Sequence, residues 1–476
     1  MSIYAVLLAG WCLAQVVIGI WIARRVRTSA DFFVAGRTLS SSAIFATFLA
    51  ANIGAGSTVG ATAYAYDNGL SAWWWNGSAG IGTIVLALWV GPRLWRVARE
   101  HDLYTIGDYI ALRYSEGLRG LTALLIWFGS FAILAAQLIG GAAVLYAVFG
   151  WPPWLGGLVS IAVVTLYFGR GGLLSSAWVN RAQIVVIVAG FVLAAILSVA
   201  GAGGWDAVTV ANSERMNFWQ GARPDMGWPL IFLLAPSFFL SPGLVQRAFA
   251  ARDERHLRRG IALSGVALMV FAALPVMIGM AAHAHLPPLE NSQTALPEML
   301  RTGVPPWIGA FALAAVFAAE LSSADAVLFM LSTSGARDLY KRYINHAASD
   351  AQQLSAVRVI AVGAAVIGYL LTFVLGTVID ALKVFYSVMV VSLFVPILAT
   401  LLMKRPSTPA AYASVLAGIT TLFAVSWLTG GRGYGWATPV FIALLVSSAA
   451  FGLASLLNRP GPDSPNPAHP LATSER

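Results

Sequence analysis

The chain has 476 residues, of which 58% are hydrophobic and only 10% are charged. A mean hydropathy of +0.76 does not fit a soluble domain, so the composition predicts an all-α polytopic membrane protein embedded in a lipid bilayer. The net charge is +9, but the cationic residues collect in alternate loops, which is typical of membrane insertion and argues against nucleic-acid binding. The single cysteine, Cys12, excludes a disulfide framework and a cysteine metal cluster.

About thirteen apolar segments are long enough to cross a bilayer. The first is preceded by no charged side chain and followed by Arg24, Arg25 and Arg27, which predicts a span with the N-terminus outside, not a cleaved signal peptide. An odd number of spans then places the C-terminus on the inner side of the cytoplasmic membrane. The expected segments are 3–23, 41–66, 71–97, 118–149, 154–170, 178–203, 228–247, 259–284, 306–334, 354–377, 380–403, 408–429 and 435–457.

Glycine and proline interrupt the second and the seventh segment, in Asn52-Ile-Gly-Ala-Gly-Ser57 and in Pro236-Ser-Phe-Phe-Leu-Ser-Pro-Gly243. Such residues weaken a helix and free backbone carbonyls, although small residues also allow close helix packing. Matching broken segments in two halves of a chain indicate inverted repeats. We therefore expect an extra N-terminal span with a cytoplasmic loop (1–40), a first repeat of spans two to six (41–203), a second repeat of spans seven to eleven (204–403), two C-terminal spans (404–458) and a disordered cytoplasmic tail (459–476).

The ninth segment carries four polar residues where hydrocarbon is expected: Glu320, Ser322, Ser323 and Asp325. Polar groups inside a membrane are costly, and by default they mark the path of an ion or a solute. Serines alone would more often bond back to their own helix. Two hydroxyls and two carboxyls so close together instead favour a functional site.

Several short motifs resemble those of the sodium:solute symporter family, and together they cover about residues 30–345. Each motif alone is weak, whereas the set is specific. The matching stretches are Asp31-Phe-Phe-Val-Ala-Gly-Arg37, Gly171-Gly-Leu173 with Trp178 and Gln183, Gln246-Arg247 with Ala250-Ala-Arg-Asp253, and Ser322-Ser323 running on to Asp338-Leu-Tyr340.

The resemblance implies a LeuT-like core of five plus five spans that couples inward Na+ flow to the import of a small organic solute by alternating access. The main sodium site would lie where the broken second span meets the ninth. Oxygen donors suit a hard cation, and neutral oxygens replace its hydration shell without burying a further charge. Carried over by position, the ligands would be the backbone carbonyls of Ala50, Ile53 and Ala319 and the hydroxyls of Ser322 and Ser323.

The sequence departs from the family on the sixth span, where many members have an aspartate at the position of Asn180. Asp325 on the ninth span has no such counterpart. We expect a second cation site in which the carboxylate has moved from the Asn180 wall to the Asp325 wall. The alternative is that Asp325 pairs with Arg181 and only joins two helices.

Glu320 also departs from the small or apolar residue that is usual in the family. It lies about 140° around the helix from Asp325, so the two acids cannot share one ion in a regular helix. A buried, unpaired glutamate tends to be neutral at pH 7. We expect Glu320 to act in coupling, by completing the sodium site, by accepting a proton or by pairing with a cationic solute.

The solute pocket is expected between the two broken spans. Its candidate residues are mostly small and neutral, which suits a small solute held by a few hydrogen bonds. The sugar branch of the family carries charged residues at the positions of Asn76 and Leu268, which argues against a sugar here. No intramembrane arginine is expected to face the pocket, so a carboxylate would need a helix N-terminus. An amino acid, a monocarboxylate, a choline-like cation and a vitamin-like solute all stay open. The candidates are Asn52, Gly56, Ser57, Asn76, Gln137, Ser237, Phe238 and Ser241.

Three other functions compete with sodium symport. A proton-coupled symporter would use Glu320 and Asp325. A sensor with a symporter fold would normally carry a cytoplasmic signalling domain, and the short stretch after Asn458 argues against one. An enzyme is not expected, because the sequence has no HExxH or GxSxG motif and no cluster of histidines.

Overall fold

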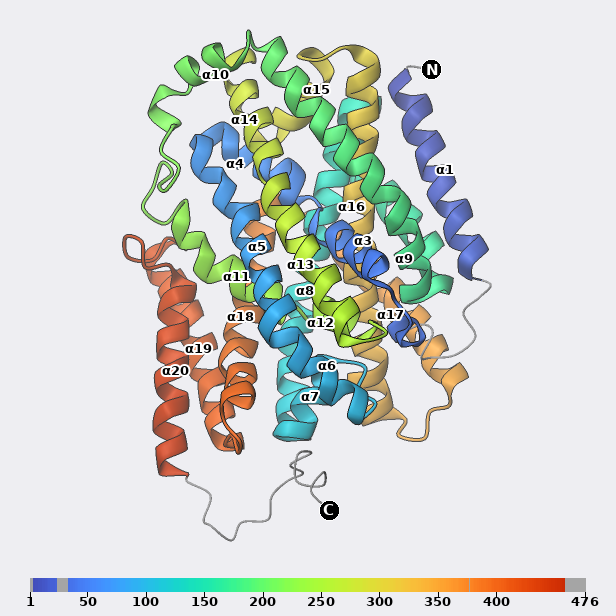
Figure 1. Ribbon diagram of the computed structural model, residues 1–476, viewed down its shortest axis with the longest axis vertical. Coiled ribbons are helices and arrows are strands. Elements are labelled where there is room, and N and C mark those ends of the chain that lie inside the picture. Colours follow the sequence, from blue (N-terminus) through green and yellow to red (C-terminus); the bar gives the residue numbers. More distant parts are fainter. Residues whose placement is uncertain (1–2, 24–32, 376, 459–476) are drawn as a thin grey trace.

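The computed structural model describes residues 3–23, 33–375 and 377–458, apart from some side chains at 15–23 and 167–175. These residues form a bundle of helices (Figure 1), and within them extended residues pair only at isolated bridges, such as that of Leu39 with Ala251. Ten helical stretches of this part are long and apolar enough to cross a membrane, and shorter apolar helices lie at Ile3–Ala14, Ser41–Asn52 and Pro153–Leu166. The all-α membrane fold is confirmed, whereas the number thirteen stays a prediction. The expected disordered tail lies outside the described residues.

The helices follow the predicted segments along the chain. They are α1 (Ile3–Ala23), α3 (Ser41–Asn52), α4 (Ala61–Asn68), α5 (Trp73–Val85), α6 (Gly91–Glu100), α7 (Ile106–Arg113), α8 (Glu116–Phe149), α9 (Pro153–Gly201), α10 (Trp205–Ala211), α11 (Ile231–Leu240), α12 (Pro242–Phe249), α13 (Glu254–Phe271), α14 (Ala273–His285), α15 (Ala295–Thr302), α16 (Pro306–Ser334), α17 (Asp350–Leu371), α18 (Val378–Leu402), α19 (Thr408–Thr429) and α20 (Pro439–Leu457).

Helix α16 forms the centre of the bundle (Figure 1). Its most apolar window is buried along its whole length, whereas the windows of α17, α19 and α20 are only 28% buried. A helix that is apolar all round packs inside a protein or in a membrane. The polar residues of α16 are therefore enclosed by protein, and the three peripheral helices are the ones with broad apolar surfaces left for lipid.

Helix α9 contains both predicted segments 154–170 and 178–203 in one helical element of 49 residues. A straight helix of that length would be about 70 Å long. Yet Trp154 shares a cavity with Pro297 of α15, and Gly201 lies against Gly303, one residue past the end of α15. Both ends of α9 therefore lie at the same end of the bundle, so the element turns back on itself as two spans would.

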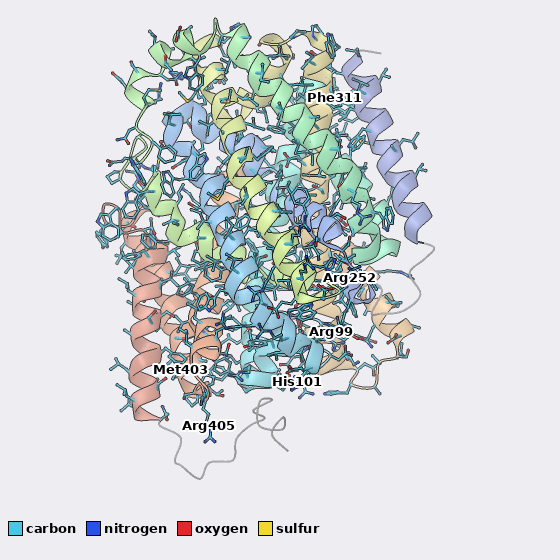
Figure 2. The ribbon with its side chains drawn as sticks, viewed as in Figure 1. Arg99, His101, Arg252, Phe311, Met403 and Arg405 are labelled. Atoms are coloured by element: carbon cyan, nitrogen blue, oxygen red, sulfur yellow. The ribbon has the colours of Figure 1, made fainter. Side chains whose placement is uncertain are left out.

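Arg99, Arg252 and Arg405 all lie in the half of the bundle in which α20 finishes, whereas α1 starts at the opposite end (Figures 1 and 2). We call the end where α20 finishes the arginine-rich end. Arg99 donates to the carbonyl of Arg252 at 2.8 Å, which joins α6 to the loop after α12.

Candidate functional site

The first broken span is interrupted where the sequence predicts. Helix α3 ends at Asn52, Ile53 is extended with φ −96° and ψ 96°, and a π-helical turn resumes at Gly56. Gly54 allows a close approach at this break, since a Cβ there would lie 2.2 Å from Oγ of Ser323 and 2.5 Å from Oε1 of Gln137. The same Gln137 oxygen accepts a hydrogen bond from the amide of Ala55 at 2.8 Å. The break is thus held directly against α8 and α16.

The second interruption, in the seventh predicted segment, lies at Ser241, between α11 and α12. Ser241 has φ −52° and ψ 120°, and Pro242 follows it as the first residue of α12. Proline lacks the amide hydrogen and disfavours a helical conformation in the residue before it, so α11 cannot continue through this point. The structure therefore confirms that the second and seventh spans are discontinuous.

Four of the five expected sodium ligands meet where α3 ends beside α16. The hydroxyl of Ser322 lies 2.9 Å from the carbonyl oxygens of both Ala50 and Ala319. The hydroxyl of Ser323 donates to the carbonyl of Ala51 at 3.2 Å. A hydroxyl carries one proton and two lone pairs, so its lone pairs stay available to a cation. Ile53, the fifth, directly follows the last residue of α3, and it is fully buried.

Asp325 and Asn180 lie together about one turn further along α16, where α9 and α3 meet it. Ser176 of α9 donates to Oδ2 of Asp325, and Nδ2 of Asn180 lies 3.4 Å from that serine oxygen and 3.3 Å from Oγ1 of Thr47. Oδ1 of Asp325 and Oδ1 of Asn180 are buried without a hydrogen-bond partner among the described residues. These two oxygens and the two neighbouring hydroxyls form a set of oxygen ligands that suits a hard cation.

Arg181 is not the partner of Asp325. Its guanidinium lies 4.7 Å from the ring centroid of Trp178, and no ion pair joins it to Asp325 among the described residues. Asp325 instead interacts electrostatically with Arg247 of α12. The alternative of a structural Asp325–Arg181 pair is therefore wrong.

Glu320 points away from Asp325, as their spacing predicts. Thr58 donates to its Oε1 at 2.8 Å, while Oε2 has no hydrogen-bond partner in the described part of the chain. Gly140 of α8 makes room for this carboxyl, because a Cβ there would lie 2.8 Å from Oε2. Glu320 thus contacts the π-helical turn just after the first break and is not part of the Ser322 cluster.

All eight expected solute residues line one cavity between the two breaks. Several of them also support the local structure: Asn76 donates to the carbonyl of Ser57 at 3.0 Å, and Ser57 donates to that of Asn52 at 2.7 Å. Ser237 donates to Leu233 of its own helix at 2.6 Å. Ser323 lines the same cavity, so the candidate ion site adjoins the candidate solute site.

Arg247 also lines this cavity, which corrects the expectation that no intramembrane arginine faces it. Sequence reasoning placed Arg247 at the end of a span, where an arginine reaches the interface. Because the span breaks at Ser241, Arg247 lies instead one turn into a buried half-helix. Trp75, Leu382 and Tyr386 are among the other lining residues that were missed, since nothing in their local sequence separates them from packing residues.

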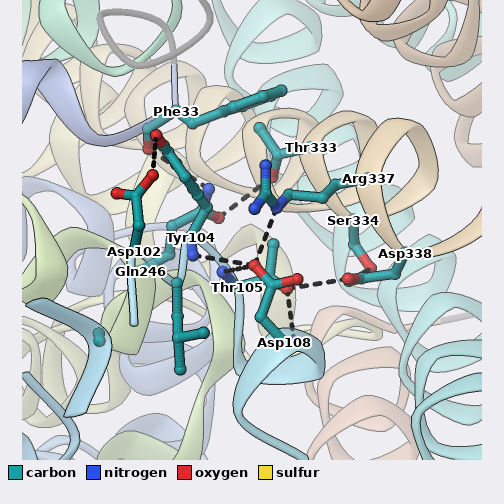
Figure 3. A network of polar contacts seen from close by, with 12 residues as sticks. Phe33, Asp102, Tyr104, Thr105, Asp108, Gln246, Thr333, Ser334, Arg337 and Asp338 are labelled. Atoms are coloured by element: carbon teal, nitrogen blue, oxygen red, sulfur yellow. Dashed lines mark hydrogen bonds and ion pairs between the residues drawn. The ribbon is translucent and has the colours of Figure 1, made fainter. Parts of the chain in front are cut away.

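Parts of three family motifs meet in a network of polar contacts (Figure 3). Gln246 donates to the carbonyl of Phe33 at 3.3 Å and accepts from Thr333 at 3.1 Å. Asp108 accepts from Arg337 at 2.8 Å, and Thr105 donates to Asp338 at 2.8 Å. These contacts join the stretches around Arg37, Gln246 and Asp338, whereas Asp31 itself lies outside the described residues.

A model of the sodium:solute symporter family matches residues 32–418. The chain belongs to the sodium:solute symporter family. It is 24% identical over 400 residues to the sodium/glucose cotransporter of Vibrio parahaemolyticus, covering 75% of this chain and 72% of that protein. It is 24% identical over 472 residues to the sodium/proline symporter of Salmonella typhimurium, covering 92% and 89%. A sodium/pantothenate symporter of Haemophilus influenzae is 26% identical over 349 residues, covering 69% and 70%.

Solved structures show the same fold. A substrate-bound, outward-open Na+-coupled sialic acid symporter matches with a TM-score of 0.82 at 19% identity, covering 97% of this chain and 98% of that one. A nucleobase-cation-symport-1 family transporter in a closed conformation matches with a TM-score of 0.62 at 14% identity, covering 90% and 95%. The core is therefore LeuT-like, and this symporter is a transporter and not an enzyme.

Proposed function

We propose that this symporter carries Na+ and a small organic solute inward together, with Na+ held where α16 lies against the break after α3. The observation that carries the proposal is the Ser322 hydroxyl, 2.9 Å from carbonyl oxygens of both elements, Ala50 and Ala319. Carbonyl and hydroxyl oxygens match the preference of a hard monovalent cation. No buried carboxylate is needed to hold it.

The position of the serines suggests how the ion and the solute are coupled. Ser322 contacts α3, and Ser323 both contacts Ala51 and lines the solute cavity. An ion that draws these oxygens together would fix the shape of the break, and Gly54 at that break also borders the cavity. Because linkage is reciprocal, a solute that favours the same shape raises the affinity for Na+ by the same factor.

We infer a second cation site at Asp325 and Asn180, next to Ser176 and Thr47. Its support is the pair of buried oxygens without hydrogen-bond partners in the described part of the chain. The carboxylate supplies a full charge, so this site would bind a cation or a proton more readily than the neutral serine site.

The solute itself is small, and the relatives do not determine its chemical class. Their names give three different solutes: glucose, a sugar; proline, an imino acid; and pantothenate, a vitamin. The cavity supports a solute held by a few polar groups among aromatic side chains, Trp75, Phe238 and Tyr386.

We propose that the arginine-rich end of the bundle is cytoplasmic, with the N-terminus outside and the C-terminus inside. Its support is the positive-inside rule applied to residues such as Arg99, Arg252 and Arg405 (Figure 2). The two breaks then belong to two five-span units, 41–203 and 204–403, of opposite topology.

Proton coupling is the second candidate, and Glu320 is the observation that favours it. Its Oε2 is buried without a hydrogen-bond partner among the described residues, so it is free to hold a proton. The two functions differ in the gradient that drives uptake.

The test is uptake into liposomes that contain the purified symporter, with glucose, proline and pantothenate and then a wider metabolite panel as probes. An inward sodium gradient at equal pH should concentrate at least one solute, and an inward proton gradient at equal sodium should not. Accumulation driven by protons alone would establish the second candidate instead.

A further inference from the structure

A separate cavity lies away from the candidate solute site, between α11 and α18 on one side and α19 and α20 on the other. It has a volume of about 520 Å³ and, among the described residues, shares no lining residue with the cavity between the two breaks. Thr438 and Pro439, where α20 begins, line it, so it lies towards the end of the bundle opposite the arginine-rich end (Figure 1). The family match ends at residue 418, so family membership does not account for the part of the wall from Leu422 to Val440.

The charged and the apolar residues of this cavity lie at different depths. Asp380 and Lys383 belong to the first two turns of α18, and Arg432 belongs to the loop between α19 and α20. Val388, which also lines the cavity, lies further along α18 than Asp380 by about 12 Å of helix. Leu422 likewise lies about two turns before the end of α19. A ligand that fills the cavity therefore needs a charged end and an apolar end.

The apolar part of the cavity is open towards the lipid-facing side of the bundle. Leu233, Val388 and Leu422 are at most 6% exposed and form its inner wall, whereas Val384 and Phe423 are 43% and 57% exposed. The most apolar window of α19 is only 28% buried, so the surface around Phe423 is left for lipid. In a membrane, acyl chains reach this part of the cavity.

Two cations in the charged part of the cavity have no partner among the described residues. Arg223 is already paired, because it donates to the carboxylate of Asp225 at 3.1 and 3.0 Å. Asp380 accepts a hydrogen bond at 2.6 Å from the residue that caps α18. Lys383 interacts electrostatically with Asp380 but forms no ion pair with it, and the side chain of Arg432 forms none either, within the described part of the chain. A lysine close to hydrocarbon is costly without an anionic partner, so the two free cations indicate a ligand with negative charge.

We propose that this cavity binds an anionic phospholipid, with its phosphate against Lys383 and Arg432 and its acyl chains along Val384 and Phe423. Lysine and arginine both bind phosphate oxygens through charge-assisted hydrogen bonds. The charged lining residues are three cations and two carboxylates, so the site has a net positive charge that favours an anionic headgroup over a zwitterionic one. A bound lipid would join α18 to the peripheral helices α19 and α20.

Thermal unfolding of the purified symporter in an uncharged detergent tests the proposal. The probes are phosphatidylglycerol, phosphatidylcholine with the same acyl chains, and glycerol 3-phosphate, which has the phosphate but no acyl chain. We expect phosphatidylglycerol to raise the unfolding temperature at a concentration at least tenfold lower than phosphatidylcholine needs, because a ligand of the folded state stabilises it. Glycerol 3-phosphate should have no effect. Equal effects of the two lipids would overturn the anionic assignment, and a full effect of glycerol 3-phosphate would overturn the lipid assignment.

Charge variants show whether the response belongs to this cavity. The double variant Lys383→Gln with Arg432→Gln removes both free cations, so the phosphatidylglycerol concentration for half the shift should rise at least tenfold. Lys383→Arg with Arg432→Lys keeps both charges and should stay within about threefold of the wild type, which separates the loss of charge from a folding defect. Lys404→Gln with Arg405→Gln is the matched control, because it removes two exposed cations just past the other end of α18. An unchanged response in Lys383→Gln with Arg432→Gln, or an equal loss in the control, would overturn the site.

Discussion

The hydroxyl of Ser322 donates to the carbonyl of Ala50 at 2.9 Å, across 272 positions of the sequence. This contact joins the central helix α16 to the end of α3, one turn before the chain loses its helical form. A backbone carbonyl in the last turn of a helix has no hydrogen-bond partner within that helix, so it is available to a hydroxyl or a cation. The relationship explains why the serine pair and the broken span belong to one site.

The close approach of Gly54 to Ser323 and Gln137 should be essential for transport. Gly54→Ala would place a methyl group 2.2 Å from Oγ of Ser323 and 2.5 Å from Oε1 of Gln137. We expect at least a tenfold loss of sodium-driven uptake and a destabilisation of about 1–3 kcal/mol, as for other overpacked cores. Gly363→Ala is the control, because nothing lies within 4 Å of a Cβ there. Normal uptake by Gly54→Ala would show that the break is not part of the site.

Glu320 should act mainly through its contact with Thr58. Glu320→Gln keeps an oxygen to accept that 2.8 Å hydrogen bond, so sodium-driven uptake should stay within about threefold of the wild type. Glu320→Ala leaves the Thr58 hydroxyl without this acceptor and should reduce uptake at least tenfold. The measurement is uptake at pH 6 to 8 under a fixed sodium gradient. If Glu320→Gln transports as poorly as Glu320→Ala, the carboxyl proton itself takes part in transport, and proton coupling gains support.

Asp325 should contribute a charge to the second cation site. Asp325→Asn keeps an oxygen for Ser176 but removes the negative charge, so the sodium concentration for half-maximal uptake should rise about tenfold, or about 1.4 kcal/mol. Glu290→Gln, at an exposed position, should leave it unchanged. If uptake by Asp325→Asn depends on sodium and pH as in the wild type, Asp325 has only a structural role.

The ion pairs of Arg119 should stabilise the network of polar contacts around Asp108 and Asp338. Arg119 donates to Asp338 at 2.6 Å and to Asp108 at 3.0 Å, and all three side chains are less than 10% exposed. Arg119→Ala leaves Asp338 unpaired, and loss of one partner of a buried ion pair costs about 3–5 kcal/mol. We expect a large drop in the unfolding temperature.

Arg342→Ala is the matched control for Arg119→Ala. Arg342 pairs with Glu116, and both side chains are more than 40% exposed, so its removal should cost at most about 1 kcal/mol. Equal unfolding temperatures for the two variants would show that the buried network does not stabilise the protein.

Local chemistry made the two breaks and the polar centre of α16 predictable. Glycines around Gly54 weaken a helix through their backbone freedom, and Pro242 ends one by sterics. Ser322 and Ser323 stand out because apolar residues surround them in the sequence. All the expected solute residues indeed line one cavity.

Partners that come from distant segments were not predictable. Ser176 reaches Asp325 from 149 positions away, and Thr58 reaches Glu320 from 262 positions away, so only the folded chain shows these contacts. Arg247 was misplaced for a related reason. A hydropathy profile gives the length of a span but not where a break within it leaves a charged side chain.

The most direct test of the account is the effect of sodium alone on unfolding of the purified symporter, measured in NaCl and in KCl at equal ionic strength. Sodium at ten times its dissociation constant should stabilise the wild type by about 1.4 kcal/mol, because a ligand that binds only the folded state adds RT ln(1 + [L]/Kd). Ser332→Ala, whose buried hydroxyl donates to the carbonyl of Phe329 in its own helix at 3.2 Å, should keep the full sodium shift. The double variant Ser322→Ala with Ser323→Ala should fold and show a clearly smaller sodium shift, because only the second cation site at Asp325 is left. A full sodium shift in that double variant would contradict the assignment of sodium to the Ser322 site.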